Sequence, residues 1–544
     1  MADITIKING RTVTAPAGST ILTAARLAGI EIPTLCFLKE INEIGACRIC
    51  VVEVKGARTL VASCVYPINE GMEVWTNTPQ VLASRKKTLQ LLLSNHERKC
   101  LSCVRSANCE LQALCRELGV DDEGLYDGEK TPSVIDDSAA HMLRDNSKCI
   151  LCRRCVAVCE SIQGVGVIGA NDRGFVTNIG SAFNMGLGET SCVSCGQCIA
   201  VCPTGALQEK DFTDKVFAAI ADPAKHVIVQ TAPAVRAALG EEFGYPIGTG
   251  VEGKMVSALK MLGFDKVFDT DFSADLTIME EAHEFLDRVQ NGGVLPLITS
   301  CSPGWIKYCE HYFPDMTKNL SSCKSPQQMF GAIAKSYYAH KAGIDPKDIV
   351  SVSIMPCTAK KFEVGRDHQA ANGVPDVDIA LTTRELARMI RKAGIKFTAL
   401  PDASYDSPLG LSTGAATIFG ATGGVMEAAL RTAVETLTGE ELKALDFTEV
   451  RGTAGIKEAT YNVAGMDVKV AVASGLNNAR ELLNKVKSGE ASYHFIEIMG
   501  CPGGCVNGGG QPQQPGYVRD TVDIRGLRAQ VLYNSDKANT IRKS

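Results

Sequence analysis

The sequence predicts a multidomain α/β protein in which small cysteine-rich modules precede a larger α/β domain. Its 544 residues, 45% of them hydrophobic, are enough for several packed domains. Of its 22 cysteines, 16 lie before Gly205 in tight groups. After Gly205, apolar strand-like runs alternate with helical runs, which is typical of an α/β domain. The first part is therefore expected to hold clusters, and the second to hold a site.

Charge and terminal sequence exclude several classes of partner. With 56 Lys+Arg against 61 Asp+Glu, the net charge of -5 offers no basic bias for nucleic acid. The start, MADITIKINGRTVTAPAG, lacks the layout of a signal peptide, and no run of about 18 apolar residues suits a membrane span. We expect a cytoplasmic protein with no membrane span and no nucleic-acid partner. Thiols stay reduced in the cytoplasm, so the cysteines favour metal over disulfides.

Residues 1–78 open with two alternating runs, ITIKI and RTVTA, joined at the hairpin signal Asn9-Gly10. Ser19 or Thr20 then caps an apolar helix, TILTAARLAGI. This order of hairpin, helix and cysteine loop predicts a small mixed α/β module.

The cysteines of this module have one leading residue, a C-x-x-C pair and a later residue. They are Cys36, Cys47, Cys50 and Cys64. Four thiolates and a glycine-containing loop suit a [2Fe–2S] cluster, whose negative charge needs backbone N–H donors. Zinc is the competing metal, because four thiolates also hold it. We predict a [2Fe–2S] ferredoxin-like domain of the β-grasp type.

Residues 79–125 combine a predicted helix, VLASRKKTLQLLLSNH, with a compact His/Cys segment. Its four candidate ligands are His96, Cys100, Cys103 and Cys109. A neutral imidazole ligand raises a cluster's potential relative to four thiolates. A Cys3His zinc site is the alternative, and only the neighbouring groups favour a [4Fe–4S] cluster here. We interpret Cys115 as a structural thiol.

Residues 126–210 carry the most specific pattern, C-x-x-C-x-x-C-x-x-x-C, twice, about forty residues apart. The first copy is Cys149, Cys152, Cys155 and Cys159, and the second is Cys192, Cys195, Cys198 and Cys202. In bacterial ferredoxins the fourth cysteine of each run ligates the other cluster. We therefore predict one [4Fe–4S] cluster on Cys149, Cys152, Cys155 and Cys202, and another on Cys192, Cys195, Cys198 and Cys159.

Residues 211–544 contain five strand candidates: HVIVQTA, GVLPLITS, IVSVSIMP, VKVAVAS and YHFIEIMG. Three of them run directly into cysteine, at Cys301, Cys357 and Cys501. Ligands bind at the carboxyl ends of strands in open α/β sheets, so these three loops are expected to converge on one metal site.

Three motifs follow these strands: TSCSPGW, MPCTAKKFE and EIMGCPGGCVNGGGQP. The glycines around Cys501 and Cys505 allow backbone N–H groups to approach cluster sulfurs. Together the motifs resemble the three signature loops of the [FeFe]-hydrogenases, and the resemblance runs from residue 2 almost to the C-terminus. The N-terminal part also resembles the cluster-bearing subunit of respiratory complex I.

The resemblance implies a C-terminal iron-hydrogenase catalytic domain with a six-iron H-cluster. This is a [4Fe–4S] cube bridged to a di-iron unit that carries carbonyl, cyanide and a dithiolate amine. Cys357, Cys501 and Cys505 would ligate the cube, with Cys505 as the bridge. Lys360 would place its charge against a cyanide, a favourable pairing in a dry pocket. A solvated lysine is the alternative.

One position departs from the family pattern, whose first loop reads T-S-C-C-P-G-W. Position by position, Cys301 keeps the proton relay, and Ser302 takes the ligand place with a harder oxygen. Either Ser302 ligates as an alkoxide, or Cys301 shifts to bind, or the cube has an open corner.

The family match also implies a proton path that runs through Glu281, Glu284, Ser321 and Cys301 in that order. Glu281 and Glu284 stand three apart and share a helix face. A solvated acidic face is the alternative interpretation. The wall of the di-iron unit would comprise Ala232, Pro233, Gln327, Met355 and Met499, for which ordinary core packing is the alternative. Cys309 and Cys323 are interpreted as structural thiols.

We therefore predict an anaerobic iron hydrogenase that interconverts protons and H₂, with one [2Fe–2S] and three accessory [4Fe–4S] clusters moving electrons. No nucleotide-binding glycine fingerprint follows a strand, so NAD(P) and flavin are expected on the partner subunits of an NAD(P)-linked or electron-bifurcating complex. Ferredoxin is the other candidate electron partner, and maturation enzymes are required for the di-iron unit. The alternatives are a hydrogen-sensing or impaired paralogue, and an electron-carrier subunit or assembly factor without a di-iron unit.

Overall fold

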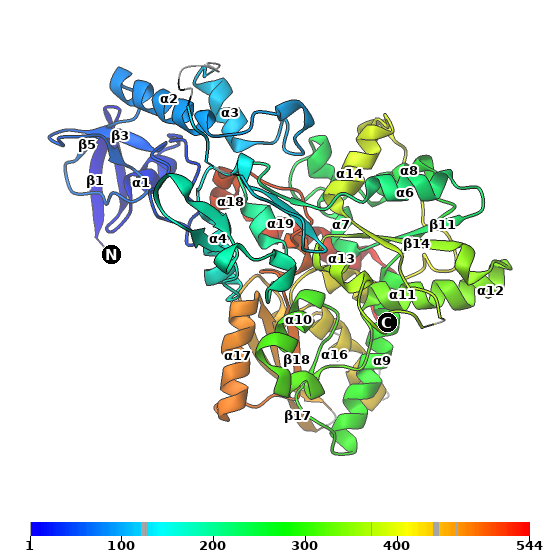
Figure 1. Ribbon diagram of the computed structural model, residues 1–544. Coiled ribbons are helices and arrows are strands. Elements are labelled where there is room, and N and C mark those ends of the chain that lie inside the picture. Colours follow the sequence, from blue (N-terminus) through cyan, green and yellow to red (C-terminus); the bar gives the residue numbers. More distant parts are fainter. Residues whose placement is uncertain are drawn as a thin grey trace.

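The N-terminal hairpin forms as the sequence predicts. The computed structural model describes residues 2–120, 126, 128–131, 133–371, 373–438, 445–463 and 465–544 (Figure 1). Strands β1 (Asp3–Ile8) and β2 (Arg11–Pro16) pair antiparallel. Asn9 and Gly10 have φ of +51° and +79°, the left-handed values that a two-residue hairpin turn requires. The hairpin prediction is confirmed.

The first module is a five-stranded mixed sheet covered by one helix. The strand order is β2-β1-β5-β3-β4, with β3 (Val51–Val54), β4 (Val61–Ala62) and β5 (Glu73–Trp75). Thr20, rather than Ser19, caps α1 (Ile21–Leu27), because its side chain accepts from the Thr23 N–H. The buried face of α1 packs on the sheet and on the cysteine loop.

The second module is a helix followed by a compact loop. Helix α2 (Pro79–Ser94) has Thr78 as its cap and Pro79 in its first turn. It ends just before His96, where the turn η1 (Cys100–Ser102) and helix α3 (Glu110–Glu117) follow. The predicted module boundary at residue 125 lies outside the described residues.

The third module repeats one backbone conformation twice. Short helices α4 (Arg154–Ala157) and α5 (Gln197–Val201) lie at equivalent places within the two cysteine runs. Leu151 and Ser194, at equivalent places in the runs, have φ of +54° and +60°. The residues just before each helix, Arg153 and Gly196, have φ of +62° and +68°. The internal duplication seen in the sequence is therefore also a duplication of backbone geometry.

Small strands complete the third module. A three-stranded sheet has the order β10-β7-β6, and β8 pairs with β9. The elements are β6 (Ile135–Asp136), β7 (Met142–Asp145), η3 (Val158–Ile162), β8 (Gly169–Asn171), β9 (Asn178–Gly180) and β10 (Leu207–Glu209).

The remaining chain contains two separate four-stranded sheets (Figure 1). The first is fully parallel, in the order β12-β11-β14-β15, with β11 (His226–Thr231), β12 (Lys266–Asp269), β14 (Ile349–Met355) and β15 (Ile379–Thr382). Helices α6 (Thr213–Ala221), α8 (Glu252–Leu262) and α14 (Thr383–Lys392) pack on one face. Helices α11 (Pro326–Ile333) and α12 (Ala339–Ala342) lie on the other.

The second sheet has the order β13-β18-β17-β16. Its strands are β13 (Leu297–Ile298), β16 (Ile456–Val463), β17 (Met466–Ser474) and β18 (Phe495–Met499). Helices α9 (Asp271–Gln290) and α16 (Gly424–Thr438) pack on one face, and α10 (Pro303–Tyr312) and α17 (Leu476–Ser488) on the other. The GVLPLITS run forms only the two-residue β13, shorter than its pattern predicts.

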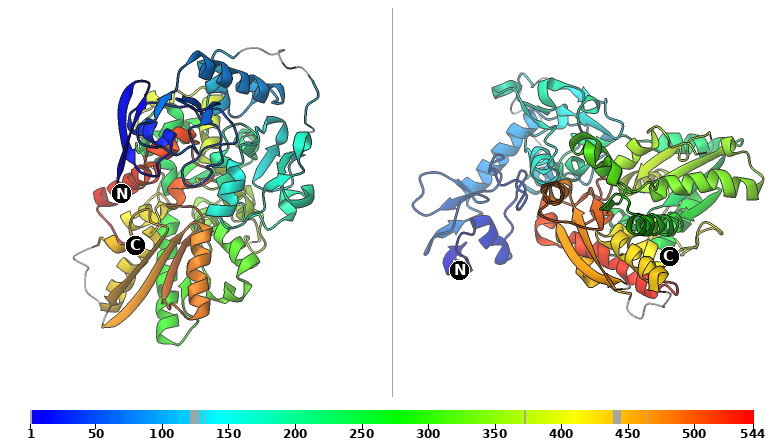
Figure 2. Two further views of the ribbon diagram at one scale, coloured as in Figure 1. Left: turned by 90° about the vertical axis from the view of Figure 1, so that its left-hand side faces the viewer. Right: turned by 90° about the horizontal axis from the view of Figure 1, so that it is seen from below.

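Further helical elements lie between these strands in sequence or after the last of them. They are α7 (Pro233–Arg236), α13 (Ala359–Val364), α15 (Gly414–Thr417), η12 (Ile418–Gly420), α18 (Gly516–Thr521) and α19 (Ile524–Ala538). Figure 2 shows the first module projecting from one side of the molecule, away from the two sheets. None of the helices in the described ranges has both the length and the apolar character that a membrane crossing requires.

Candidate active site

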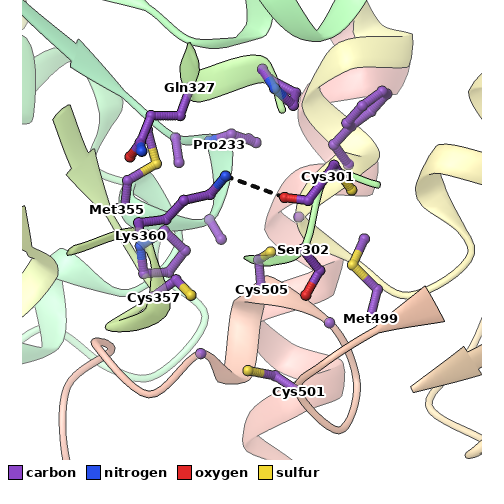
Figure 3. A pocket seen from close by; sticks show the side chains of 18 of the residues that line it. Pro233, Cys301, Ser302, Gln327, Met355, Cys357, Lys360, Met499, Cys501 and Cys505 are labelled. Atoms are coloured by element: carbon purple, nitrogen blue, oxygen red, sulfur yellow. Dashed lines mark hydrogen bonds between the residues drawn. The ribbon is translucent and has the colours of Figure 1, made fainter. Parts of the chain in front are cut away.

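The three cysteine loops meet at one cavity between the two sheets. Cys357 follows β14 of the first sheet, whereas Cys301 and Cys501 follow β13 and β18 of the second. All three line the cavity together with Cys505 (Figure 3). The strand ends therefore converge as predicted, but they come from two sheets that face each other and not from one.

The other residues expected around the site are mostly found there. The predicted cofactor-wall residues Ala232, Pro233, Gln327, Met355 and Met499 all line this cavity, as do Ser302 and Lys360. Apart from Lys360 and Gln327, these wall side chains are apolar or small. The cavity is therefore a dry pocket in which a few polar groups act at full strength.

The thiols of Cys357, Cys501 and Cys505 are partly buried and line the enclosed cavity. Burial raises the pKa of Cys357, and raises that of Cys501 to about 12. Burial raises the pKa of Cys505 as well, and the two neighbouring thiols raise it further. Three thiols that repel each other's negative charge in a dry pocket need a cation to become thiolates, and iron meets this requirement. The donor set fits a cluster.

Glycines bring the third loop close to its neighbours. Gly504 has φ of +96°, and a Cβ there would lie 2.6 Å from the Thr422 nitrogen. A Cβ on Gly509 would lie 2.2 Å from the carbonyl oxygen of Cys195 in the accessory module. The glycine excess of this loop therefore also permits direct backbone packing against the neighbouring cluster loop.

Ser302 and Cys301 occupy different positions in the pocket. In Figure 3 the Ser302 hydroxyl lies on the side of the Cys501 and Cys505 thiols, whereas the Cys301 thiol is directed away from them. The Ser302 hydroxyl oxygen accepts a hydrogen bond from the Gly500 N–H at 3.2 Å. Of the two side chains, Ser302 is the better placed to complete a ligand set with the three thiols.

Lys360 is buried and held by two acceptors. Its side chain is 10% exposed, and its ammonium donates to Glu363 Oε2 at 2.9 Å and to the Cys301 carbonyl at 3.2 Å (Figure 3). The same Glu363 oxygen accepts from Ser325 and Gln327, both at 2.9 Å. The solvated-lysine interpretation is therefore wrong. Glu363 was not assigned a role from the sequence, although its i,i+3 spacing from Lys360 on one helix is a signal for such a pair.

The predicted proton path begins next to this pocket. Glu281 of α9 is 1% exposed, and burial raises its pKa to about 7, with Glu284 and Glu497 raising it further. Ser321 lies beside Glu281 and donates to Glu284 Oε2 at 3.1 Å. Glu284 is half-buried and pairs with Arg288. Of the two carboxyl groups, that of Glu284 therefore lies in partly exposed surroundings and that of Glu281 in fully buried surroundings.

Cys323 also lies on this path, although the sequence assigned it only a structural role. Its N–H donates to the Ser321 hydroxyl at 3.2 Å, and burial with Glu281 nearby raises the pKa of its thiol to about 12. Both Cys323 and Cys301 lie within the electrostatic influence of Glu281. No sequence spacing predicted that Cys323 would lie there.

This geometry agrees with the comparison to known families. The profile described as the C-terminal domain of the iron-only hydrogenase large subunit matches residues 225–509, which include all three cysteine loops. The chain belongs to the iron-only hydrogenase family. Three further profiles match this hydrogenase: a 2Fe-2S cluster-binding domain over residues 1–79, an NADH-ubiquinone oxidoreductase-G iron–sulfur binding region over 85–123, and a 4Fe-4S dicluster domain over 148–206. These matches favour iron over zinc in the N-terminal modules.

Full-length relatives share the whole domain arrangement. The hydrogenase is 52% identical over 555 residues to the NADP-reducing hydrogenase subunit HndD of Solidesulfovibrio fructosivorans, covering all of this chain and 94% of the relative. It is 44% identical to iron hydrogenase 1 of Clostridium pasteurianum, covering 99% and 94% of the two chains. A solved [FeFe]-hydrogenase, HydA(deltaEFG), superposes with a TM-score of 0.55 at 42% identity, covering 61% of this chain and 91% of that one.

The first accessory site of the iron-only hydrogenase gathers its four cysteines. The Cys50 and Cys64 sulfurs lie 3.3 Å apart, and the Cys47 N–H donates to the Cys36 sulfur at 3.5 Å. All four lie in or against the buried core of the first module. A thiolate set held this closely, with an N–H aimed at sulfur, suits a small anionic cluster.

The third module of the hydrogenase brings together the cysteines of the two crossed sets. A small cavity is lined by Cys149, Cys152, Cys155 and Cys202, the predicted first set. The neighbouring thiols that raise the pKa of Cys198 include Cys195, Cys192 and Cys159, the predicted second set. In both cases the fourth cysteine of one run lies with the first three of the other.

The His/Cys site of the hydrogenase lies in the second module. His96 is 8% exposed, and its Nδ1 has no hydrogen-bond partner among the described residues. Cys103 and Cys109 lie within electrostatic reach of each other. Cys100 and Cys109 both raise the pKa of Cys115, so this thiol lies nearer to the site than the structural role assigned from the sequence suggests.

Proposed function

We propose that this chain is a hydrogenase that catalyses 2H⁺ + 2e⁻ ⇌ H₂. The observation that carries the proposal is the convergence of Cys357, Cys501 and Cys505 on one dry cavity beside a buried carboxyl with a raised pKa. Three thiols that line an enclosed cavity suit a cluster, and an acid with a pKa of about 7 suits proton transfer at neutral pH.

Cys357, Cys501 and Cys505 would hold the cube of an H-cluster, with Cys505 as the bridge and Ser302 as the fourth ligand. The side-chain directions in Figure 3 favour Ser302 over Cys301 for that place. When bound, the H-cluster supplies the di-iron centre with carbonyl and cyanide at which dihydrogen is cleaved heterolytically. The buried Lys360 ammonium would face an anionic group of this centre.

This chain's own residues would move the protons. Glu284 would take a proton near the surface, and Ser321 would connect it to the buried Glu281. Glu281 lies within the electrostatic influence of Cys301, so a thiol would make the last transfer towards the pocket. The carboxyl of Glu281 has no hydrogen-bond partner of good geometry among the described residues. It is therefore free to accept a proton and to donate it again.

Accessory clusters would move the electrons. We propose one [2Fe–2S] cluster in residues 1–78, a His-ligated [4Fe–4S] cluster in 79–125 and two [4Fe–4S] clusters in 126–210, ahead of a catalytic domain in 211–544. Cys195, in the last of these cluster loops, packs against Gly509 of the catalytic loops. This contact supports an electron path that ends at the cube.

The electron partner is proposed to be an NAD(P)-linked subunit or a ferredoxin. HndD is named as a subunit of an NADP-reducing hydrogenase, and residues 85–123 match a region of the NADH-ubiquinone oxidoreductase G subunit. Both names favour a multisubunit complex whose other members bind the nucleotide. The need for maturation enzymes and the cytoplasmic location stay predictions.

A second candidate is a slow or hydrogen-sensing hydrogenase, which Ser302 favours. An alkoxide is a harder ligand than a thiolate and would change the potential of the cube. An assembly-factor role also has relatives, such as cytosolic iron-sulfur assembly component 3 of Pongo abelii, 33% identical over 53% of this chain. That match covers only half of the chain, whereas HndD and iron hydrogenase 1 cover 100% and 99% of it.

A hydrogen-uptake assay on the matured protein tests the proposed function. The acceptors are methyl viologen, ferredoxin and NAD(P)⁺. Under H₂, each of them should be reduced only if it can take electrons from the accessory clusters. We expect uptake with viologen, and with either ferredoxin or NAD(P)⁺ plus partner subunits. Matured protein that contains all its iron and still takes up no H₂ with any acceptor would contradict the proposal.

A further inference from the structure

A second cavity, of about 440 Å³, lies behind the loops that carry the predicted cluster ligands. Three of its lining residues, Val158, Gln197 and Pro502, each stand next in sequence to a predicted ligand. Residues 38–41 of the first module and 519–525 near the C-terminus complete the walls. In Figure 1 α18, which carries part of this segment, lies where the N-terminal modules meet the catalytic domain.

Two arginines on the walls have no partner in the part of the chain that the structure describes. Arg519 of α18 and Arg525 of α19 line the cavity, and neither has a hydrogen bond or an ion pair from its guanidinium to a described residue. Two neighbouring arginines, in contrast, have acidic partners. Arg528 pairs with Glu241 at 2.6 Å, and Arg154 pairs with Glu110 at 2.7 Å. Arg519 is partly buried, whereas Arg525 is exposed. A partly buried guanidinium without an acceptor is costly, so the cavity lacks a negative group beside Arg519.

The acids on the walls already have partners. Asp520 accepts from the Arg26 guanidinium at 3.0 Å and from the Lys39 N–H at 3.0 Å. Glu40 is exposed and pairs with Lys39 at 3.6 Å. Asp523 caps α19 by accepting from the Gly526 N–H at 3.0 Å. The uncompensated charge that faces the cavity therefore comes from the two arginines, and it is positive.

We infer that this cavity binds a small anion with a phosphate or carboxylate group, held between Arg519 and Arg525. A guanidinium presents paired N–H donors that match either group in bidentate fashion. Apolar wall residues, among them Ile41, Ile162 and Ile524, leave room for a short organic part beside the charge. Phosphate and carboxylate share this recognition chemistry, so the experiment distinguishes them.

The site lies where bound charge would act on the electron path. Gln197 lines the cavity, donates to the Asn507 carbonyl at 2.9 Å and lies close enough to Cys501 to lower the pKa of its thiol. A negative charge this close to two cluster loops makes both clusters harder to reduce. An anion here would therefore shift the hydrogenase towards H₂ evolution. This consequence rests on the proposed function, whereas the binding itself does not.

Calorimetric titration of the cluster-loaded full chain tests the binding. Inorganic phosphate and malonate are titrated separately into the wild type and into Arg519→Gln, Arg525→Gln and Arg11→Gln. Arg11 is an exposed arginine on β2 and serves as the matched control. We expect one saturable site for at least one anion, weakened roughly tenfold or more by either cavity variant, as the loss of a charge-assisted bidentate contact predicts. Arg11→Gln should bind as the wild type does.

The outcomes of these titrations distinguish a phosphoryl ligand from a carboxylate ligand. Saturation by phosphate alone assigns a phosphoryl ligand, and saturation by malonate alone assigns a carboxylate. Absence of saturable binding by both anions overturns the inference, and so does binding that neither cavity variant weakens. Iron content and circular dichroism of each variant exclude misfolding as the cause of lost binding.

A potentiometric titration, monitored by electron paramagnetic resonance, tests the expected effect of the bound anion on the cluster potentials. In the wild type, the saturating anion should move the midpoint potentials of the nearest [4Fe–4S] clusters to more negative values, and in Arg519→Gln it should not. Binding without any shift would reject the role in electron transfer and leave the site itself standing. A protein that binds the anion but does not turn over H₂ would contradict the proposed function alone.

Discussion

The Thr358 hydroxyl donates a 2.8 Å hydrogen bond to the carbonyl of Ser194. Thr358 follows Cys357 in the catalytic domain, and Ser194 precedes Cys195 in the accessory module. Gly196 lies so close that a Cβ there would be 2.3 Å from the Thr358 hydroxyl oxygen. This buried polar contact therefore helps to fix the last accessory cluster loop to the catalytic loop.

Thr358→Val should weaken this junction. The Ser194 carbonyl would lose a buried donor, which costs about 1 to 3 kcal/mol. We expect slower H₂ uptake with electron carriers that act through the accessory clusters, and a lower melting temperature. Thr358→Ser keeps the hydroxyl and serves as the control. Equal rates and melting temperatures in the wild type and Thr358→Val would contradict this account of the junction.

Glu281→Gln should abolish most proton transfer. General acid–base groups contribute roughly 10² to 10⁴-fold to rate, and an amide cannot carry the proton. We expect H₂ evolution to fall within this range while iron content is unchanged. Glu280→Gln, at the exposed neighbouring position, should keep full activity. Near-normal turnover in Glu281→Gln would remove Glu281 from the path.

The same variant should be more stable at alkaline pH. Burial raises the pKa of Glu281 from 4.5 to about 7, so the folded state keeps a proton that the unfolded chain releases above pH 4.5. As the pH rises from 4.5 to 7, the folded protein loses stability, by up to about 3 kcal/mol relative to a neutral side chain, and the loss is complete above pH 7. Scanning calorimetry should show Glu281→Gln melting above the wild type at pH 8 and close to it near pH 4.5. A pH-independent difference would contradict the raised pKa.

Ser321 and Ser322 provide a matched pair of variants. Both hydroxyls donate to Glu284 Oε2, at 3.1 Å and 3.0 Å, but Ser321 alone also lies beside Glu281. Ser321→Ala should therefore slow H₂ evolution, and Ser322→Ala should not. The measurement that checks this is the rate of H₂ evolution at several proton concentrations, with the electron supply held constant. Similar losses in both variants would mean that the serines only position Glu284.

Ser302→Cys should change the catalytic cube and leave the accessory clusters as they are. A thiolate in place of a harder alkoxide raises the midpoint potential of the cube, which electron paramagnetic resonance follows during reduction. Ser302→Ala, which removes the ligand, should change the same signal differently. If Cys301 were the fourth ligand instead, neither substitution would move it.

Local pattern was sufficient to predict much of this molecule. The hairpin at Asn9-Gly10, helix α2 and the two crossed cysteine sets depend on neighbours in sequence, and each is found where the pattern indicates. The convergence of the three loops also followed from the placement of cysteines directly after predicted strands.

What the sequence did not predict depends on long-range pairing. Strand β13 pairs with β18, which lies almost two hundred residues further along the chain, so the division into two sheets has no local signal. Pro296 and the absence of alternation leave β13 only two residues long. The unpaired Arg519 is visible only after α18 has packed against the N-terminal modules, because a charged residue on a short helix is usually solvated.

Infrared absorption of the protein, after maturation by di-iron assembly enzymes, tests the central claim most directly. If Cys357, Cys501 and Cys505 hold a cube bridged to a di-iron unit, bands from iron-bound carbonyl and cyanide must appear, and they must disappear in Cys505→Ser while the accessory-cluster signals remain. Matured, iron-replete protein without those bands would contradict the assignment of this pocket as a hydrogenase site.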